Sequence, residues 1–272
     1  MQVKLFPNSQ LGGDPAMLTQ LRSGALEILA FPGAFLTTVP LAAIENVAFA
    51  FPNSAAVFRA MDGNLGGVIK DAIKATGTWV LDRIWENGFR DLTTSTKPIH
   101  NVEDLAGFKI RVSPGKIRVD TFQSLGASPT PIAASELYTA LQTKVVDGQE
   151  NPLLTIETLH LFEVQKYCSL SHHMWSGYWT LFNPDAWKRL PADLQAIVTR
   201  EFTRATLDER RDTALQSASV QDKLHRQGLT FNAVDRESFK RKLVANGYYS
   251  RWQKEFGEKA WSALESYAGK FA

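Results

Sequence analysis

The sequence is poor in cysteine and in concentrated charge. Cys168 is the only cysteine among 272 residues, which excludes intramolecular disulfides and zinc sites made of several thiolates. Lysine and arginine number 30 against 28 acidic residues, and the basic residues form no runs, so nucleic acid is not an expected partner. No apolar run approaches the roughly 20 residues that a membrane-spanning helix needs, so we expect no insertion of the chain itself into a membrane.

Motifs of catalysis and metal binding are also missing. There is no Gly-x-Ser-x-Gly elbow, no Walker-type loop and no His-Glu-x-x-His. His172 and His173 are adjacent and would point to opposite sides of a strand, which argues against a shared metal ion. Glu136, Asp147 and Glu150 offer an acid–base set, but helix-start and turn roles explain the same residues. We therefore expect no enzyme activity, no metal and no cofactor, and keep a carboxylate-processing enzyme as an alternative.

The composition and periodicity that are present predict an α/β protein. At 272 residues a single core usually stops growing, so two lobes or one large α/β unit are expected. Apolar residues at helical spacing predict helices over 14–23, 56–75, 117–125, 135–143 and 190–227. Short apolar runs predict strands over 3–6, 26–31, 78–85, 108–112 and 229–234, with the first two paired in parallel. The proline-rich residues 128–131 predict a rigid connector.

Four stretches of the chain form an ordered set of motifs. They are Phe6 to Gly13 with the helix Met17 to Gly24 behind it, Lys97 to Val112, Gly126 to Pro131, and Glu136 to Pro152. Each motif alone has moderate specificity, but their order and spacing together are highly specific. In that order they resemble the solute-binding proteins of tripartite ATP-independent periplasmic (TRAP) transporters, and the resemblance covers essentially the whole chain.

The resemblance implies a two-lobed, periplasmic-binding-protein-like fold with the ligand in a cleft between the lobes. Crossing strands and a long helix would join the lobes, with 1–87 plus 177–216 in the first and 88–176 plus 217–272 in the second. It implies a monomeric protein of the periplasm that captures a small organic carboxylate unaltered and delivers it to a small and a large membrane subunit. A receptor that presents its ligand to a membrane sensor kinase is the alternative function.

The start of the chain departs from the family pattern. Only Met1 to Leu5 precede the Phe6-Pro7 motif, whereas the family has a strand and a helix there, so we expect about thirty residues, one strand–helix unit, to be missing. The first residues also lack the charged start, apolar core and cleavage site of a secretory signal. We therefore expect the native protein to be exported by a signal that lies upstream of this sequence or has been removed.

The resemblance assigns the ligand carboxylate to Arg111. This residue ends a predicted strand, where open α/β sheets place ligand crevices, and its planar guanidinium offers two parallel donors to a carboxylate. Arg118 lies in a similar stretch but falls inside the helix that should separate the arginine from Gly126, so we give it a structural role. Arg90 matches a second family arginine at the pocket edge, and Asn151 an asparagine that hydrogen-bonds the same carboxylate.

Two aromatic residues complete the predicted site. Trp175 and Tyr178 lie in a segment that should cross between the lobes, and one of them would pack on the body of the ligand. Trp175 has an equal alternative role in the hinge or the core. Pro32-Gly33 and Ala134 differ from the better-known members of the family, so the far wall of the pocket stays open. The candidate ligands are keto and hydroxy acids, sugar acids, C4 dicarboxylates and aromatic acids.

Overall fold

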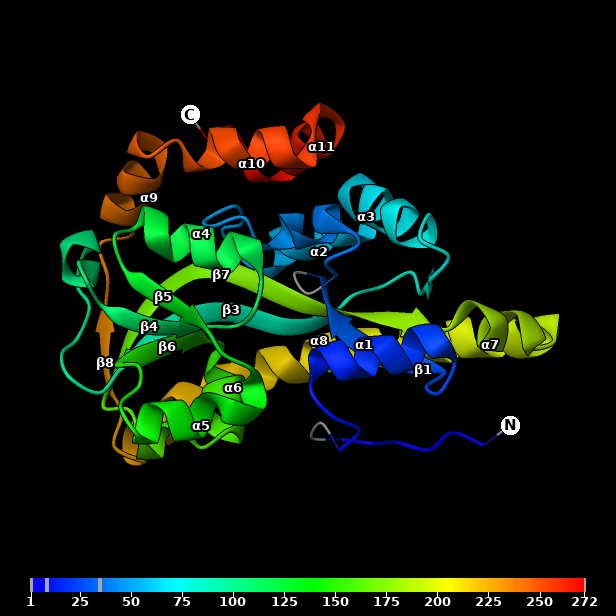
Figure 1. The fold of residues 1–272 in the computed structure, drawn as a ribbon, viewed down its shortest axis with the longest axis horizontal. Coiled ribbons are helices and arrows are strands. Elements are labelled where there is room, and N and C mark those ends of the chain that lie inside the picture. The colour runs from blue at the N-terminus through cyan, green and yellow to red at the C-terminus, as the bar shows by residue number, and fades with distance from the viewer. Residues whose placement is uncertain (1, 8–9, 34–35, 272) are drawn as a thin grey trace.

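The computed structural model describes residues 2–7, 10–33 and 36–271, and Figure 1 shows its ribbon. The α-helices are α1 (Asp14–Ser23), α2 (Ser54–Asp62), α3 (Asn64–Lys74), α4 (Lys116–Ser124), α5 (Ala134–Gln142), α6 (Leu153–Thr158), α7 (Pro184–Arg189), α8 (Ala192–Arg226), α9 (Arg236–Ala245), α10 (Tyr248–Phe256) and α11 (Glu258–Ala268). The strands are β1 (Ile28–Pro32), β2 (Trp79–Val80), β3 (Trp85–Thr94), β4 (Lys109–Val112), β5 (Ser128–Pro131), β6 (Gly148–Asn151), β7 (Tyr167–Phe182) and β8 (Thr230–Ala233). Short 3-10 helices are η2 (Pro40–Asn46), η3 (Val102–Leu105) and η4 (Leu161–Glu163).

One long strand, β7, organises the sheet. The order is β1-β7-β3-β6-β4-β5, and β2 and β8 also pair with β7. The C-terminal half of β7 pairs antiparallel with β1, whereas its N-terminal end pairs in parallel with β8. Strand β3 lies antiparallel to β7 over most of its length. These two strands therefore run through both halves of the molecule, and this arrangement confirms the two-lobed α/β prediction (Figure 1).

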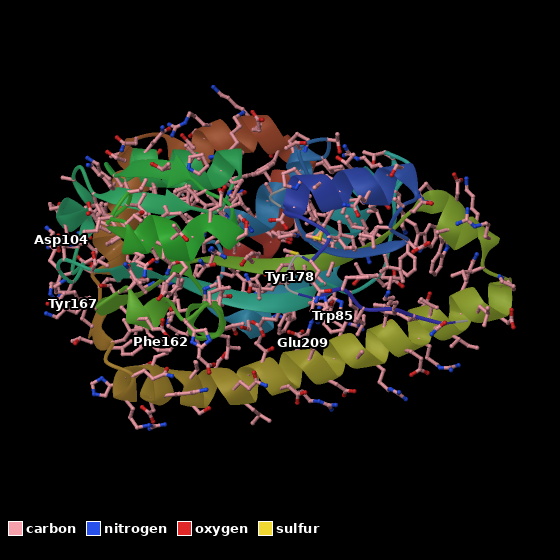
Figure 2. The ribbon with its side chains drawn as sticks, turned by 60° about the horizontal axis from the view of Figure 1, so that its bottom comes forward. Trp85, Asp104, Phe162, Tyr167, Tyr178 and Glu209 are labelled. Carbon is pink, nitrogen blue, oxygen red and sulfur yellow. The ribbon has the colours of Figure 1, made fainter. Side chains whose placement is uncertain are left out.

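The helix α8 runs along one side of the sheet for most of the molecule's length (Figure 2). Its 35 residues correspond to roughly 50 Å at the α-helical rise. It contacts β3 in one half of the molecule and α6 in the other. Glu209 fixes one of these contacts, because its Oε2 accepts a hydrogen bond of 3.1 Å from the backbone N–H of Glu86 at the start of β3. The predicted long helix over 190–227 is confirmed, with bounds shifted by one or two residues.

The C-terminal helices divide between the two halves. Helix α9 contacts α4 and η3, α10 contacts α4 and η2, and α11 packs on α2 and α3. Tyr267 of α11 accepts a hydrogen bond of 3.4 Å from the backbone N–H of Asn64. We expected 217–272 to belong to the second lobe, whereas α11 covers helices of the first. The lobe boundaries stay a prediction.

Two local predictions at the ends of the sheet are wrong. Residues 3–6 belong to no strand, since they lie exposed without a partner, and Leu5 is 83% exposed. Strand β1 accordingly pairs antiparallel with β7 and not in parallel with those residues. Residues 128–131 form β5, where we expected a connector, and pair in parallel with β4. Prolines 129 and 131 are tolerated there because β5 is the last strand of the sheet order and lacks a second neighbour to receive their missing N–H groups.

Candidate ligand-binding site

Arg90 lies in the middle of β3 and is 1% exposed. It forms an ion pair with the Glu150 carboxylate through Nε and through Nη2, the latter at 3.0 Å from Oε1. Nη2 also donates to the Glu150 carbonyl at 2.7 Å and to Asn151 Oδ1 at 2.8 Å. Longer contacts of 3.3 Å reach the hydroxyls of Ser113 and Ser176. The donors of Arg90 are therefore already engaged, and its main role is to hold neighbouring polar groups in place.

Glu150 is the buried counter-ion of this cluster. Burial alone would raise the pKa of its carboxyl, but the Arg90 charge, together with the nearby His173 ring and the hydrogen bonds from Arg90, holds that pKa well below its ordinary value. His173 Nε2 lies 3.4 Å from Oε2, and its Nδ1 lies 2.8 Å from Ser171 Oγ. The carboxylate thus stays ionised at neutral pH and neutralises Arg90. The sequence placed Glu150 in a polar turn because its partner, sixty positions earlier in the chain, is not visible to local patterns.

Arg111 differs from Arg90 in having donors to spare. It lies in β4, is 1% exposed, and donates from Nε to the Ile132 carbonyl at 2.9 Å. Its two terminal nitrogens form no hydrogen bond with any residue that the structure describes. Burial and the Arg90 charge lower the pKa of Arg111, and Glu150 and Asp14 oppose them, with a result of about 10. The guanidinium therefore stays charged at neutral pH, with two parallel donors open to an anion.

Asn151 and Tyr178 lie near this cluster. The Asn151 amide is engaged at both ends, with Oδ1 on Arg90 and Nδ2 donating to Gln149 Oε1 at 2.5 Å. Tyr178 lies in β7 opposite Trp85 of β3, as Figure 2 shows, and its hydroxyl makes no hydrogen bond with the described residues. Burial raises the pKa of Tyr178, while the Arg90 and Arg118 charges oppose that rise. The charges of Arg90 and Arg118 therefore act on the Tyr178 hydroxyl.

Trp175 packs into the hydrophobic core. It is 1% exposed, its Nε1 donates to Glu86 Oε1 at 3.2 Å, and its ring meets that of Phe58 edge-on with centroids 6.3 Å apart. Gly177 allows this packing, because a Cβ there would lie 2.4 Å from the Trp175 ring. Of the two roles left open by the sequence, these contacts favour packing over contact with a ligand.

Arg118 lies closer to the site than its structural assignment implied. It is 2% exposed, and its Nε donates to Asn46 Oδ1 at 3.0 Å, while Asn46 Nδ2 donates to the Trp175 carbonyl at 3.1 Å. These bonds fit a structural role. Its charge nevertheless lowers the pKa values of Glu150 and Glu45. With Arg90 neutralised by Glu150, Arg111 and Arg118 leave the surroundings positively charged and suited to an anion.

Asp14 and Glu45 are acidic residues that the sequence did not connect with the site. Asp14 is the first residue of α1, directly after the N-cap Gly13, and its carboxylate makes no hydrogen bond with described residues. Burial raises the pKa of Asp14, and the Arg111 and Arg118 charges oppose that rise. Glu45 is fully buried in η2, where its Oε2 accepts a hydrogen bond of 3.0 Å from Trp179 Nε1.

Glu45 should make the stability of the protein depend on pH. Burial raises the pKa of Glu45 to about 8, although the Trp179 hydrogen bond and the Arg118 charge oppose this. A raised carboxyl pKa stabilises the fold below the unfolded-state value of 4.5 and loses that contribution as pH rises to about 8. We expect the melting temperature of Glu45→Gln to rise relative to that of wild type between pH 5 and 8. Above pH 8 the difference between the two melting temperatures should stay constant. A difference that does not change between pH 5 and 9 in thermal unfolding would contradict this assignment.

Within the described ranges, no group of three or more histidine, cysteine and acidic side chains is arranged to hold a metal ion. Among the helices of the same ranges, none combines the length and apolarity that a bilayer crossing requires.

Two buried guanidinium groups therefore lie close together, Arg90 on β3 and Arg111 on β4, and the terminal nitrogens of Arg111 have no partner among the described residues. The chain belongs to the bacterial extracellular solute-binding protein family 7, whose model matches residues 1–254. It is 31% identical over 241 residues to the 2,3-diketo-L-gulonate-binding periplasmic protein YiaO of Escherichia coli. The aligned region covers 88% of this chain and 73% of that protein. It is 39% identical over 231 residues to the uncharacterized protein y4mM of Sinorhizobium fredii, and spans 42% of its length.

Solved structures show the same fold. The sugar acid binding protein DctPAm of Advenella mimigardefordensis, in complex with galactonate, superimposes with a TM-score of 0.94 at 29% identity, covering all of this chain and 88% of that one. A TRAP periplasmic solute-binding protein of Polaromonas sp. JS666, bound to D-erythronate, gives a TM-score of 0.91 at 31% identity, covering 96% and 86%. The chain is therefore a TRAP-type solute-binding protein in fold and family.

Proposed function

We propose that this protein binds a small organic acid between its lobes and that Arg111 grips the carboxylate. The observation that carries the proposal is the Arg111 guanidinium, which is buried and charged yet has two terminal nitrogens without a partner among the described residues. Burying charged donors costs free energy unless an acceptor is supplied, and a ligand carboxylate would supply two. The 2,3-diketo-L-gulonate, galactonate and D-erythronate of the relatives are all carboxylic acids, which supports the same chemistry.

Asn151, Arg90 and Tyr178 would complete the site in different ways. Arg90 and Asn151 are bonded to each other, so they would present the Asn151 amide in a fixed orientation. The Tyr178 hydroxyl is free to bond a polar group on the body of the ligand. Trp175 would support the site from the core, without touching the ligand. A buried charged hydrogen bond contributes roughly 1.5–3 kcal/mol, and micromolar affinity needs about 8 kcal/mol, so several contacts and closure of the lobes must act together.

The cellular role follows from the family. We propose that the protein is periplasmic and monomeric, and that it hands its acid, chemically unaltered, to a small and a large TRAP membrane subunit. The lobes would be 1–87 plus 177–216 and 88–176 plus 217–272, with α11 packed across onto the first.

A thermal-shift screen of organic acids tests the ligand class. An acid present at a hundred times its dissociation constant should add about 2.7 kcal/mol to the free energy of unfolding and raise the melting temperature by several degrees. Sugar acids, hydroxy and keto acids, C4 dicarboxylates and aromatic acids form the panel, with the corresponding uncharged sugars and amides as controls. Shifts of equal size for an acid and its amide would refute carboxylate recognition.

A further inference from the structure

The pairing of β3 with β7 is interrupted at one place beside the carboxylate site. Arg90 of β3 stands opposite Met174, and Leu92 stands opposite Ser169. Between these pairs, the single residue Asp91 faces the four residues of β7 from 170 to 173. This wide bulge breaks the regular ladder, so its backbone needs other partners.

Asp91 supplies those partners from inside the bulge. Its carboxylate is 1% exposed, and Oδ1 accepts a hydrogen bond of 2.9 Å from the His172 backbone N–H. The same oxygen lies 2.8 Å from His172 Nδ1, so one carboxylate oxygen binds both the main chain and the ring of one residue. His172 has a φ of 43°, in the left-handed region that residues other than glycine rarely adopt. The Asp91–His172 pair thus holds a backbone conformation that is unfavourable by itself.

Two other elements close around the same residue. Arg236 of α9 donates from Nη2 to the His172 carbonyl at 3.4 Å, and its guanidinium lies 5.6 Å from the centre of the Phe49 ring. Phe49, itself at φ 56°, donates its N–H to the His173 carbonyl at 2.7 Å. The Phe89 ring of β3 lies against the His172 ring, with centroids 6.1 Å apart. The charged side chains that act on His172 are therefore Asp91 from β3 and Arg236 from α9.

The bulge connects directly to the carboxylate site at both of its edges. Arg90 precedes Asp91 in β3, and His173 follows His172 in β7; both Arg90 and His173 contact Glu150. The geometry points to Asp91 and His172 as positioning residues of the binding site, whose pair holds the β7 bulge so that Arg90 and His173 converge on Glu150. This inference rests on the proposed function for its effect on affinity, but its structural core does not depend on any ligand.

The interaction between Asp91 and His172 should depend on pH, because one of its partners is a histidine. The hydrogen bond to Asp91 raises the pKa of His172, although partial burial and Arg236 oppose the rise. The charged imidazolium is therefore favoured in the folded state, and its contribution is complete below the unfolded-state pKa of about 6.5 and is lost as pH rises through the folded-state pKa. Neutral His172 can still donate from Nδ1, but charge-assisted hydrogen bonds are about twice as strong. The hydrogen bond between His172 and Asp91 therefore weakens at high pH without breaking.

His172→Asn is the sharpest test. Asparagine tolerates positive φ, so the variant should fold, yet it removes the ionisable ring. We expect wild type to exceed the variant in affinity by about threefold at pH 6, and the two to converge above pH 8, in calorimetric titrations with galactonate, D-erythronate and succinate. The side-chain ¹⁵Nε resonance of Arg90, followed by NMR without ligand, should shift in the variant at pH 6 and match wild type at pH 8.5.

The controls separate positioning from general stability. His160→Asn changes another histidine at positive φ, which lies 3.8 Å from Glu163 and is exposed, and should leave both readouts unchanged. Asp91→Asn should reproduce the His172→Asn effect, and the double variant should add nothing further, because both changes break one interaction. A constant affinity ratio across pH 6–8.5, or an Arg90 resonance that does not move, would overturn the inference. If no acid of the screening panel binds wild type while the resonance shifts as expected, the positioning role of Asp91 and His172 stands and the proposed ligand class falls.

Discussion

Replacing Arg111 with lysine should lower the affinity for the acid by roughly 10- to 100-fold while the fold persists. Lysine keeps the charge but presents a single ammonium, so the two parallel bonds to a carboxylate are lost. A charged hydrogen bond contributes roughly 1.5–3 kcal/mol, and every 1.4 kcal/mol is a tenfold change in affinity. The Arg111 Nε bond to the Ile132 carbonyl would also be lost, but it lies at the end of the sheet order and should affect stability little. Isothermal titration with the best acid of the screen measures the effect.

Arg210→Lys is the matched control for a buried arginine. Arg210 is 7% exposed and binds Asp62 with two nitrogens at 2.8 and 3.0 Å, on the side of the molecule where α8 meets β3. This substitution should lower the melting temperature without changing the affinity. If Arg111→Lys binds as tightly as wild type, or if both variants lose affinity equally, Arg111 does not hold the carboxylate.

Removing the Glu150 carboxylate should cost the protein about 3–5 kcal/mol of unfolding free energy. Glu150→Ala leaves the Arg90 guanidinium buried without its counter-ion, and an uncompensated buried charge is among the most destabilising changes known for a single residue. Affinity should fall as well, because Arg90 would turn away from Asn151. Urea denaturation of the variant and wild type at pH 7 measures the loss.

Two comparisons isolate the charge effect from the loss of the side chain. Glu157→Ala removes the partner of Lys223 from a partly exposed ion pair between α6 and α8, and should cost no more than about 1 kcal/mol. The double variant Arg90→Met, Glu150→Leu replaces both charges with apolar groups and should recover much of the stability without recovering binding. Equal losses for Glu150→Ala and Glu157→Ala would show that the buried pair is not a stabilising element.

Local sequence patterns predicted the helices well because each helix is set by nearby residues. The apolar spacing and the terminal Gly24 fixed α1, which ends at a left-handed cap with φ 77°. The helical spacing of apolar residues also predicted α8, although its buried side chains include the polar Thr206 and Arg210. Strand partners could not be predicted so readily, since pairing depends on segments far apart in the chain. Residues 3–6 have the alternation of a strand but find no neighbour.

The candidate site shows the same difference between what nearby residues determine and what contacts between distant residues determine. Arg111 could be proposed because the motifs around it identify the family, and its role in binding stays a prediction; its terminal nitrogens have no partner among the described residues. The engagement of Arg90 by Glu150 and the cluster around Arg118 could not be foreseen, because both depend on side chains brought together by folding. The role of Trp175 could not be decided from the sequence, because a tryptophan beside a predicted site could contact either the ligand or the core. The hydrogen bond from its Nε1 to Glu86 favours the core.

The central place of β7 also constrains how the chain reaches its final form. Strand β1 pairs with residues 178–182, roughly 150 positions downstream, so more than half of the 272 residues must follow β1 before this pairing can form. Contacts of such long sequence separation form slowly and leave apolar segments exposed in the meantime. Strand β1 is therefore expected to join the sheet among the late steps of folding.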